Sequence, residues 1–470
     1  MRILNRFRLD ILEAALIVAA IVLIALMFVP FLLGQGIKDR YHAMLTEVAD
    51  FTGKSVRIED YRQGWFTSKA TLELKDPEIP VTFVGHQRVF HGPLYLGMLT
   101  QGRSPVVAAV VKGELVPAVQ DDTLFEALFQ GRPPLIYEGV IRHNGNIEWR
   151  FNVPAFAGQY PGEVQNVELA SSDITLNVEY IADTGHFVGK STVPEFKFFA
   201  GQSGIQINGA QLTFDSRKGS EGLMVGDSTF SFAQMVTQGQ NGEGFVLNGL
   251  ASQGSVEEQG DGLDISQYVK VQEMLVGEET LREIELSLKL RSLNQKALLG
   301  LRELQQQMER KTREGIPDEQ VSAIVMGEIM RLLPDLLKQA SIAVMPIKMH
   351  SDAGEFQGEL NVSLEGLADA DLMDPVSIVK ATSLSANMSI DELMMRKLIE
   401  VPAKANGAAN RKPDDNARDE TLSLLREQHV LALEDGVYRS EVELKKGVLK
   451  LNGKMVNPLT LVQSLNQPQQ

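Results

Sequence analysis

The chain has 470 residues, a net charge of −16 and no cysteine. The missing cysteine excludes disulfides, thiolate zinc sites, iron–sulfur clusters and a cysteine nucleophile, and it fits an oxidising compartment. An acidic chain is a poor binder of nucleic acid and of anionic membrane surfaces, so we expect no nucleic-acid partner.

Residues 14–33 read AALIVAAIVLIALMFVPFLL and carry no charge. A bilayer core about 30 Å thick needs about 20 apolar residues in a helix. We therefore expect one transmembrane helix here, and a short cytoplasmic segment over 1–13. The residues that anchor it in the bilayer are Leu16, Ile17, Val18, Ile21, Val22, Leu23, Ile24, Leu26 and Phe28.

The charges that flank this run predict its orientation. Three arginines precede it, Lys38 and Arg40 follow it, and the positive-inside rule then places the N-terminus in the cytoplasm and the bulk outside. The first 33 residues carry a net charge of +1, so the part that follows carries −17. A cleaved signal peptide is the competing interpretation, but its apolar region is shorter and ends at a small-residue site. A buried core helix is the other alternative, and apolarity on every face disfavours it.

Beyond the run, the sequence predicts a membrane-proximal helix within 34–53 and a long β-rich region over 54–294. Apolar and polar residues alternate at 147–153, 174–180 and 284–290, and turn-forming clusters separate such segments. Clean alternation is typical of antiparallel sheets, because buried parallel strands read as solid apolar runs.

Helical composition returns in a mixed α+β region over 295–401, at 295–310 and 319–340. Residues 402–417 are small and polar and predict an exposed loop. The last region, 418–470, predicts a helix over 419–433 and a hairpin around Lys446-Gly447. The expected fold class is α+β and mostly antiparallel β: a transmembrane helix, then an elongated many-stranded sheet, which can curl, with a few covering helices.

No motif assembles a catalytic, cofactor or metal site. The seven histidines show no H-E-x-x-H spacing, and no G-x-S-x-G or S-x-x-K context favours a serine enzyme. We therefore expect a protein that is not an enzyme and has no cofactor.

Two local clusters are nevertheless unusual. The first places Gly64, Trp65 and Phe66 beside Tyr61 and Ser68, and the second is His91-Gly92-Pro93. Structural roles are expected for both. Gly64 permits an irregular backbone, one of the two rings covers the end of a sheet, and His91 donates to a backbone carbonyl.

These clusters, the apolar run and the ending at Asp435-Gly436-Val437-Tyr438 resemble the YdgA-type family over nearly the whole chain. Its members are bacterial inner-membrane proteins with a large periplasmic part and no assigned activity. The resemblance implies the same anchored topology, with the bulk in the periplasm, and implies no catalytic residues.

Two functions remain open, with a hydrolase ranked last. The first is a non-catalytic, inner-membrane-anchored periplasmic protein that binds or conveys a lipidic ligand in a β-sheet groove. The second is a structural or protein-interaction component of the envelope, including a homodimer. The plainer alternative to a groove is that the helices at 295–340 and 419–433 cover the apolar face of the sheet.

Overall fold

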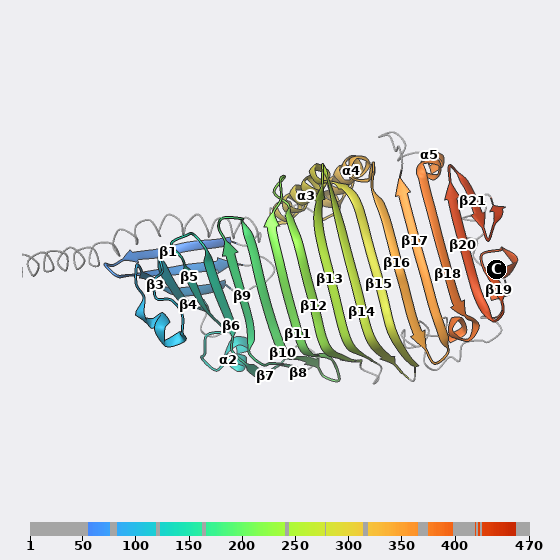
Figure 1. Ribbon diagram of the computed structural model, residues 1–470. Coiled ribbons are helices and arrows are strands. Elements are labelled where there is room, and N and C mark those ends of the chain that lie inside the picture. The colour runs from blue at the N-terminus through green and yellow to red at the C-terminus, as the bar shows by residue number, and fades with distance from the viewer. Residues whose placement is uncertain are drawn as a thin grey trace, which may run out of the picture. The chain divides into compact units, whose positions relative to one another are not determined.

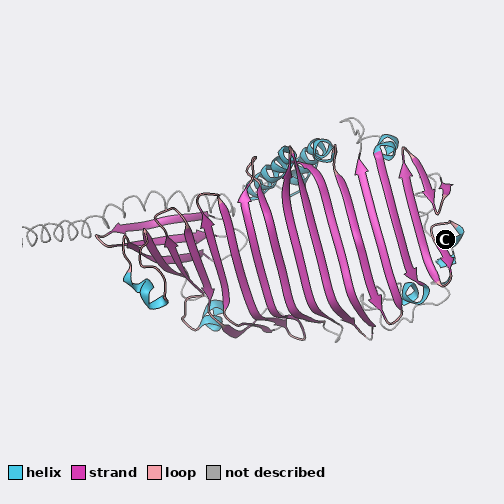
Figure 2. Ribbon diagram, in the orientation of Figure 1, coloured by secondary structure: helices cyan, strands magenta, loops and turns pink. Residues whose placement is uncertain are grey.

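The computed structural model describes residues 55–75, 82–118, 123–161, 166–239, 244–277, 279–313, 318–364, 375–397, 419, 422–423 and 425–456. The transmembrane helix predicted over 14–33, the helix within 34–53 and the loop over 402–417 lie outside these residues. Two compact units divide the chain, Met1–Phe196 and Lys197–Gln470. Strands dominate both units (Figure 1, Figure 2), so the prediction of a mostly antiparallel β fold is confirmed.

The first unit is built on an antiparallel sheet in which most strands pair with their neighbour in the chain. Its strands are β1 (Ser55–Gln63), β2 (Thr67–Lys75), β3 (Thr82–His91), β4 (Ala109–Pro117), β5 (Leu135–Ile141), β6 (Ile147–Val153), β9 (Ile174–Ile181) and β10 (His186–Ala200), paired in that order. A hairpin of β7 (Phe156–Pro161) and β8 (Asn166–Ser171) packs on α2 (Thr123–Phe129), and β8 also pairs with β10. The 3-10 helix η1 (Leu96–Gln101) lies between β3 and β4.

Both faces of this sheet carry a core, because successive side chains of a strand point to opposite faces. Val89, Val111 and Tyr137 are buried on one face, with Trp149 packed against them. Val110 of β4 points the other way, into a second cluster with Met98 of η1. The Tyr137 ring lies over Gly113 and the Trp149 ring over Gly139, at positions that any side chain on these glycines would occupy.

The second unit contains a longer antiparallel meander. Its strands, in pairing order, are β11 (Ser203–Lys218), β12 (Met224–Gln238), β13 (Phe245–Gln259), β14 (Gly262–Val276), β15 (Glu279–Asn294), β16 (Ser341–Ser351), β17 (Gly354–Leu364), β18 (Thr382–Asp391), β20 (Val437–Lys445), β21 (Val448–Leu451) and β22 (Lys454–Val456). The short β19 (Ala432–Glu434) also pairs with β20.

This sheet is open, so the expectation that it curls is corrected. Each strand pairs with the next along the chain, except that β18 pairs with β20, and in the described residues no pairing brings β20, β21 or β22 back to β11. A closed sheet would need such a pairing, together with a matching stagger of the strands.

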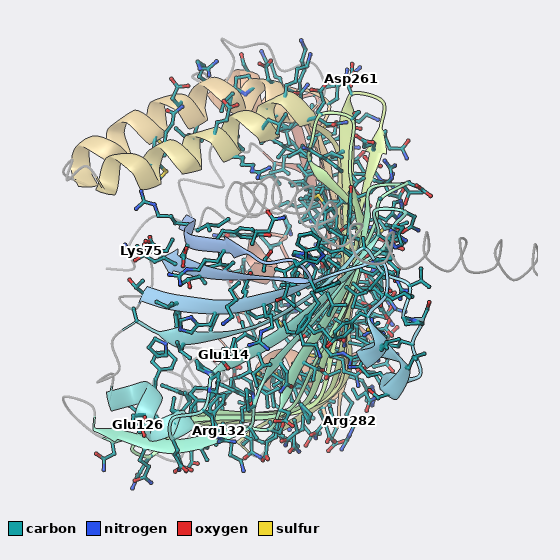
Figure 3. The ribbon with its side chains drawn as sticks, turned by 90° about the vertical axis from the view of Figure 1, so that its left-hand side faces the viewer. Lys75, Glu114, Glu126, Arg132, Asp261 and Arg282 are labelled. Atoms are coloured by element: carbon teal, nitrogen blue, oxygen red, sulfur yellow. The ribbon has the colours of Figure 1, made fainter. Side chains whose placement is uncertain are left out.

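The helices at 295–310 and 319–340 are confirmed as α3 (Gln295–Arg313) and α4 (Asp318–Leu337), which contains Pro334. They form a hairpin in which Leu332 packs over Gly300. Figure 3 shows the hairpin projecting from the end of the sheet near Asp261, where it contacts β15. The shorter α5 (Pro375–Ala381) precedes β18.

Helices therefore do not cover the whole sheet of the second unit. Near the C-terminus a core forms around Ile390, Met394 and Tyr438, with Leu422 and Leu431. The helix predicted to reach Leu433 ends earlier, because Ala432–Glu434 pairs with β20 as a strand. Pairing with an existing edge overrides the weak helical propensity of this short stretch. The predicted C-terminal hairpin is confirmed as β20 and β21.

We predict that Gly113→Ala destabilises the protein by about 1–3 kcal/mol, the usual range for overpacking a core. The added Cβ would lie 2.5 Å from Cζ of Tyr137, and the buried ring would have to move. Urea unfolding measures the change. Gly327→Ala is the control, because nothing lies within 4 Å of the new Cβ there and alanine favours the helix. Equal stability of the two variants would contradict the packing described for Tyr137.

We also predict a pH dependence that comes from Tyr137. Burial raises the pKa of its phenol to about 12, against a hydrogen bond donated by Gln87 that lowers it. The unfolded phenol titrates near pH 10, so this contribution to stability is complete below pH 10 and is lost as the pH rises to about 12. Unfolding free energies at pH 9 and 11.5 should show a loss of about 2 kcal/mol in the wild type that Tyr137→Phe removes. A loss of the same size in both proteins would refute the assignment.

Candidate functional site

The two sequence clusters meet at the turn between β1 and β2. Ser68 Oγ lies 2.8 Å from Nε2 of His91, and Nδ1 of His91 donates to the backbone oxygen of Trp65 at 3.3 Å. The backbone N–H of His91 donates to the oxygen of Phe66 at 2.8 Å. The expectation that His91 donates to a carbonyl is confirmed, and the ring ties the turn to the end of β3.

The two glycines of this cluster allow close backbone approach. A Cβ on Gly64 would lie 2.5 Å from the oxygen of Thr67, and Gly92 has even less room against Val107 and Ala108. The N–H of Gly92 donates to the oxygen of Ala108 at 2.7 Å, and Pro93 accepts from Val107 at 3.1 Å. These contacts leave no space for larger residues.

The Ser68–His91 pair is arranged for structure and not for catalysis. Ser68 is 0% exposed and His91 5% exposed, so a substrate cannot reach the hydroxyl. A nucleophilic serine also needs its histidine oriented by a third group as the proton moves, commonly a carboxylate. Here Nδ1 faces the neutral Trp65 carbonyl. Tyr61 lies in β1, opposite Ala70 of β2.

Trp65 and Phe66, by contrast, are 41% and 52% exposed. The prediction that one of these rings covers the end of the sheet is not met, because both side chains face solvent. The hydrogen bonds of their backbone oxygens to His91 hold the turn with both rings outward. They are the members of the motif most accessible to a partner.

An ionic cluster beside this turn was not apparent from the sequence. Arg103, which follows η1, pairs with Glu138 at 3.2 Å and with Glu148 at 2.5 Å. Arg142 also binds Glu148 at 2.5 Å, and Lys112 binds Glu138 at 2.9 Å. Arg142 and Glu148 are six positions apart, but strand register brings together the other pairs from 26 to 45 positions apart, which no local pattern reveals.

The protonation states of the cluster follow from these contacts. Burial opposes the charge of Glu148, but hydrogen bonds from Arg142 and Arg103 outweigh it, and the pKa of Glu148 lies below its usual value. The hydrogen bond to Glu138 raises the pKa of Lys112 against its partial burial. The charges compensate one another, so the cluster fastens the segment after η1 to the sheet and holds no poised acid or base.

The second unit offers a different kind of site, an apolar sheet face. Ile284, Leu286, Leu288 and Leu290 of β15 share one face, and their partners on the neighbouring strands are apolar except for Gln267, which lies opposite Leu288. The longest row follows the register through Ile265, Leu290, Ile342, Val362, Leu384, Leu444 and Leu449. A parallel row runs through Leu288, Val344, Leu360, Ala386, Val442 and Leu451. We call the side chains of these rows, with those in register with Ile284 and Leu286, the apolar face.

The opposite face of the same strands is polar. Lys270 and Glu285 pair across β14 and β15 at 3.0 Å, and Tyr268 lies opposite Ser287. On the apolar face, Leu212, Phe230, Leu286 and Ile342 remain 37–40% exposed. Side chains of this size are normally covered in a folded protein, so the middle of the face is accessible to an apolar ligand.

A row of polar side chains also crosses β11–β15. Asn208, Gln234, Asn248 and Glu273 are joined by hydrogen bonds of 3.0–3.5 Å, and Arg282, labelled in Figure 3, pairs with Glu273 at 3.6 Å. Next to it, Gly209, Gly249 and Glu283 have φ of 68°, 64° and 50°. Left-handed backbone interrupts the alternation of a strand, so the pattern over 284–290 ends at Glu283.

We predict that Ser68→Ala destabilises the protein by about 1–3 kcal/mol, because Nε2 of His91 is left buried without its hydroxyl partner. Thermal unfolding and the emission of Trp65 measure the effect. Ser104→Ala, at an exposed serine, is the control. The wild type should also fail to react with a fluorophosphonate probe. Labelling of Ser68 would show that the hydroxyl is accessible and nucleophilic.

Comparison with known proteins identifies a family and no activity. The curated proteins and the solved structures gave no match to this chain. In the described ranges no three His, Asp or Glu side chains lie where they could hold a metal ion, and no helix there is long and apolar enough to cross a membrane. The model of a family described as a bacterial protein of unknown function (DUF945) matches residues 11–458. The predicted likeness to an uncharacterised bacterial family over nearly the whole chain is therefore confirmed, and the chain belongs to this family.

Proposed function

We propose that this protein binds or conveys a lipidic ligand on the apolar face of its second unit. The single observation that carries the proposal is that face, whose central side chains lie in rows across β14–β21 and stay partly exposed. Contact with acyl chains would remove this surface from water, at roughly 25 cal/mol per Å² of apolar area.

The dimensions of the face suit an extended ligand. Neighbouring strands lie about 4.8 Å apart, so a chain laid across four of them spans roughly 15 Å. Each methylene that becomes buried contributes about 0.8 kcal/mol. Because the rows are continuous, a ligand can shift along them without losing contact area, which suits transfer as well as storage.

The proposed location is the bacterial inner membrane, with one N-terminal helix over 14–33 and the bulk in the periplasm. The uninterrupted apolar run, the three arginines before it and the acidic, cysteine-free remainder support this topology. It agrees with the likeness to YdgA-type proteins. A protein tethered in this way would hold its apolar face close to the source of its ligand.

The proposal is of a binding protein and not of an enzyme, and it needs no cofactor. A face made mostly of Leu, Ile, Val, Ala and Phe side chains, with Ser252 and Gln267 among them, recognises apolar surface and offers no general acid or base. Lys270 and Glu285 lie on the opposite face and pair with each other.

We predict that a photoreactive benzoyl-phenylalanine at Phe230 crosslinks to lipid in bacterial membranes. Phe230 is 40% exposed and lies in register, through Ser252 and Val269, with Leu286 of the apolar face. The same residue at Thr229 is the control, because Thr229 is exposed on the opposite face of the same strand. Mass spectrometry of the full-length protein should find lipid adducts at 230 and not at 229.

Other results would favour the second function. Reproducible crosslinks from 230 to another envelope protein, without lipid, would indicate a protein-interaction component, and crosslinks to a second copy would indicate a homodimer. Equal lipid adducts at 229 and 230 would mean that the apolar face has no special role, and the proposal would be abandoned.

A further inference from the structure

A second exposed apolar surface lies in the first unit, around the turn between β1 and β2. Its members, which we call the Trp65 patch, are exposed by 41–67%: Trp65, Phe66, Leu94, Leu96, Leu99 and Val106. In Figure 1 the blue helical segment η1, which carries Leu96 and Leu99, lies near this end of the strands. Isolated exposed leucines are ordinary, but a group of this size marks an interaction surface.

The contacts around the patch give its members a firm support. Leu94 and Val106 form an isolated antiparallel β-bridge. His91 donates hydrogen bonds from Nδ1 to the backbone oxygen of Trp65 and from its backbone N–H to that of Phe66. Beneath the exposed leucines, Met98 of η1 is 0% exposed and packs against Phe90 and Tyr95. The buried methionine fixes η1, so Leu96 and Leu99 are held outward and do not fold back into the unit.

The charge around the patch differs from that of the rest of the protein. Residues 61–72 and 82–113 contain five Lys or Arg and no Asp or Glu, in a chain of net charge −16. Glu138 and Glu148 are held by Arg103, Lys112 and Arg142, and Asp60, which precedes the turn in β1, is paired with Arg62. An anionic membrane surface would therefore repel the patch less strongly than it repels the rest of this acidic chain.

The connection to the apolar run allows the patch to reach a bilayer. Twenty-one residues separate Leu33 from Ser55, where β1 begins. As the helix that the sequence predicts they would span about 30 Å, and fully extended about 70 Å. The nine residues of β1 place the patch about 30 Å from the end of the linker. The linker is at least as long as this distance, so it can allow the patch to return to the membrane surface.

From these observations we propose that the Trp65 patch docks on the lipid bilayer as a second membrane contact, beside the N-terminal helix. Tryptophan and phenylalanine prefer the bilayer interface, and leucines of a fixed surface helix insert below it. The inference rests on the membrane anchoring proposed above and on none of the residues of the apolar face. Docking would hold the first unit in one orientation on the membrane.

The experiment uses the full-length protein in vesicles that contain brominated phosphatidylcholine. Trp65 and Trp149 are the two tryptophans of the chain, so Trp149→Phe leaves Trp65 as the sole emitter and Trp65→Phe leaves Trp149. We expect bromine near the headgroup end of the acyl chains to quench Trp65 at least twofold. Trp149, packed over Gly139 inside the unit, should keep its emission.

A charged variant tests the rest of the patch. Leu96→Glu with Leu99→Glu, in the Trp149→Phe background, should abolish quenching of Trp65. The matched control is Leu393→Glu, which alters a leucine of the second unit with the same 57% exposure as Leu99. Far-UV circular dichroism spectra that match the wild type would show that all the variants compared are folded.

The outcomes separate this inference from the anchoring. Protein that floats with the vesicles while Trp65 is not quenched overturns the docking and leaves the anchor in place. Protein that does not float contradicts both. Protection of Trp65 that depends on protein density in the vesicles would assign the patch to a second copy and would also overturn the docking.

Discussion

Antiparallel pairing between strands that follow one another in the chain is the constraint on which this protein depends. It turns a simple alternation of apolar and polar residues into faces that extend over many strands. In β15, Ile284, Leu286, Leu288 and Leu290 point one way and Glu285, Ser287 and Lys289 the other. Because the register is kept from strand to strand, the same division repeats from β14 to β21.

Much of this could be predicted from local patterns. The alternation over 147–153, 174–180 and 284–290 became β6, β9 and part of β15, and the two helical segments became α3 and α4. These elements are long and periodic, so their own sequence determines them. The short segment near Leu433 was assigned wrongly, since its conformation is decided by an edge of β20 that lies outside the local window.

The candidate sites were harder to predict, for physical reasons. The sequence predicts that His91 donates to a backbone carbonyl, because a histidine at the end of a strand needs a partner, but it does not predict that the carbonyl is that of Trp65. The burial of Ser68 and the exposure of both rings depend on how two hairpins meet. The Arg103 cluster depends wholly on register, and the interruption at Gly209, Gly249 and Glu283 appears only when three separate strands are aligned.

The last strands of the second unit have a consequence for assembly. Strand length falls from 15 or 16 residues in β11–β15 to four in β21 and three in β22. An outer strand presents unpaired backbone groups that can recruit strands from other molecules, and natural sheets limit this by shortening it. β22 has only three residues, Lys454–Val456, so it provides an incoming strand with too few backbone hydrogen bonds to extend the sheet. Within the described residues, this short border therefore limits growth of the sheet from the side of β22.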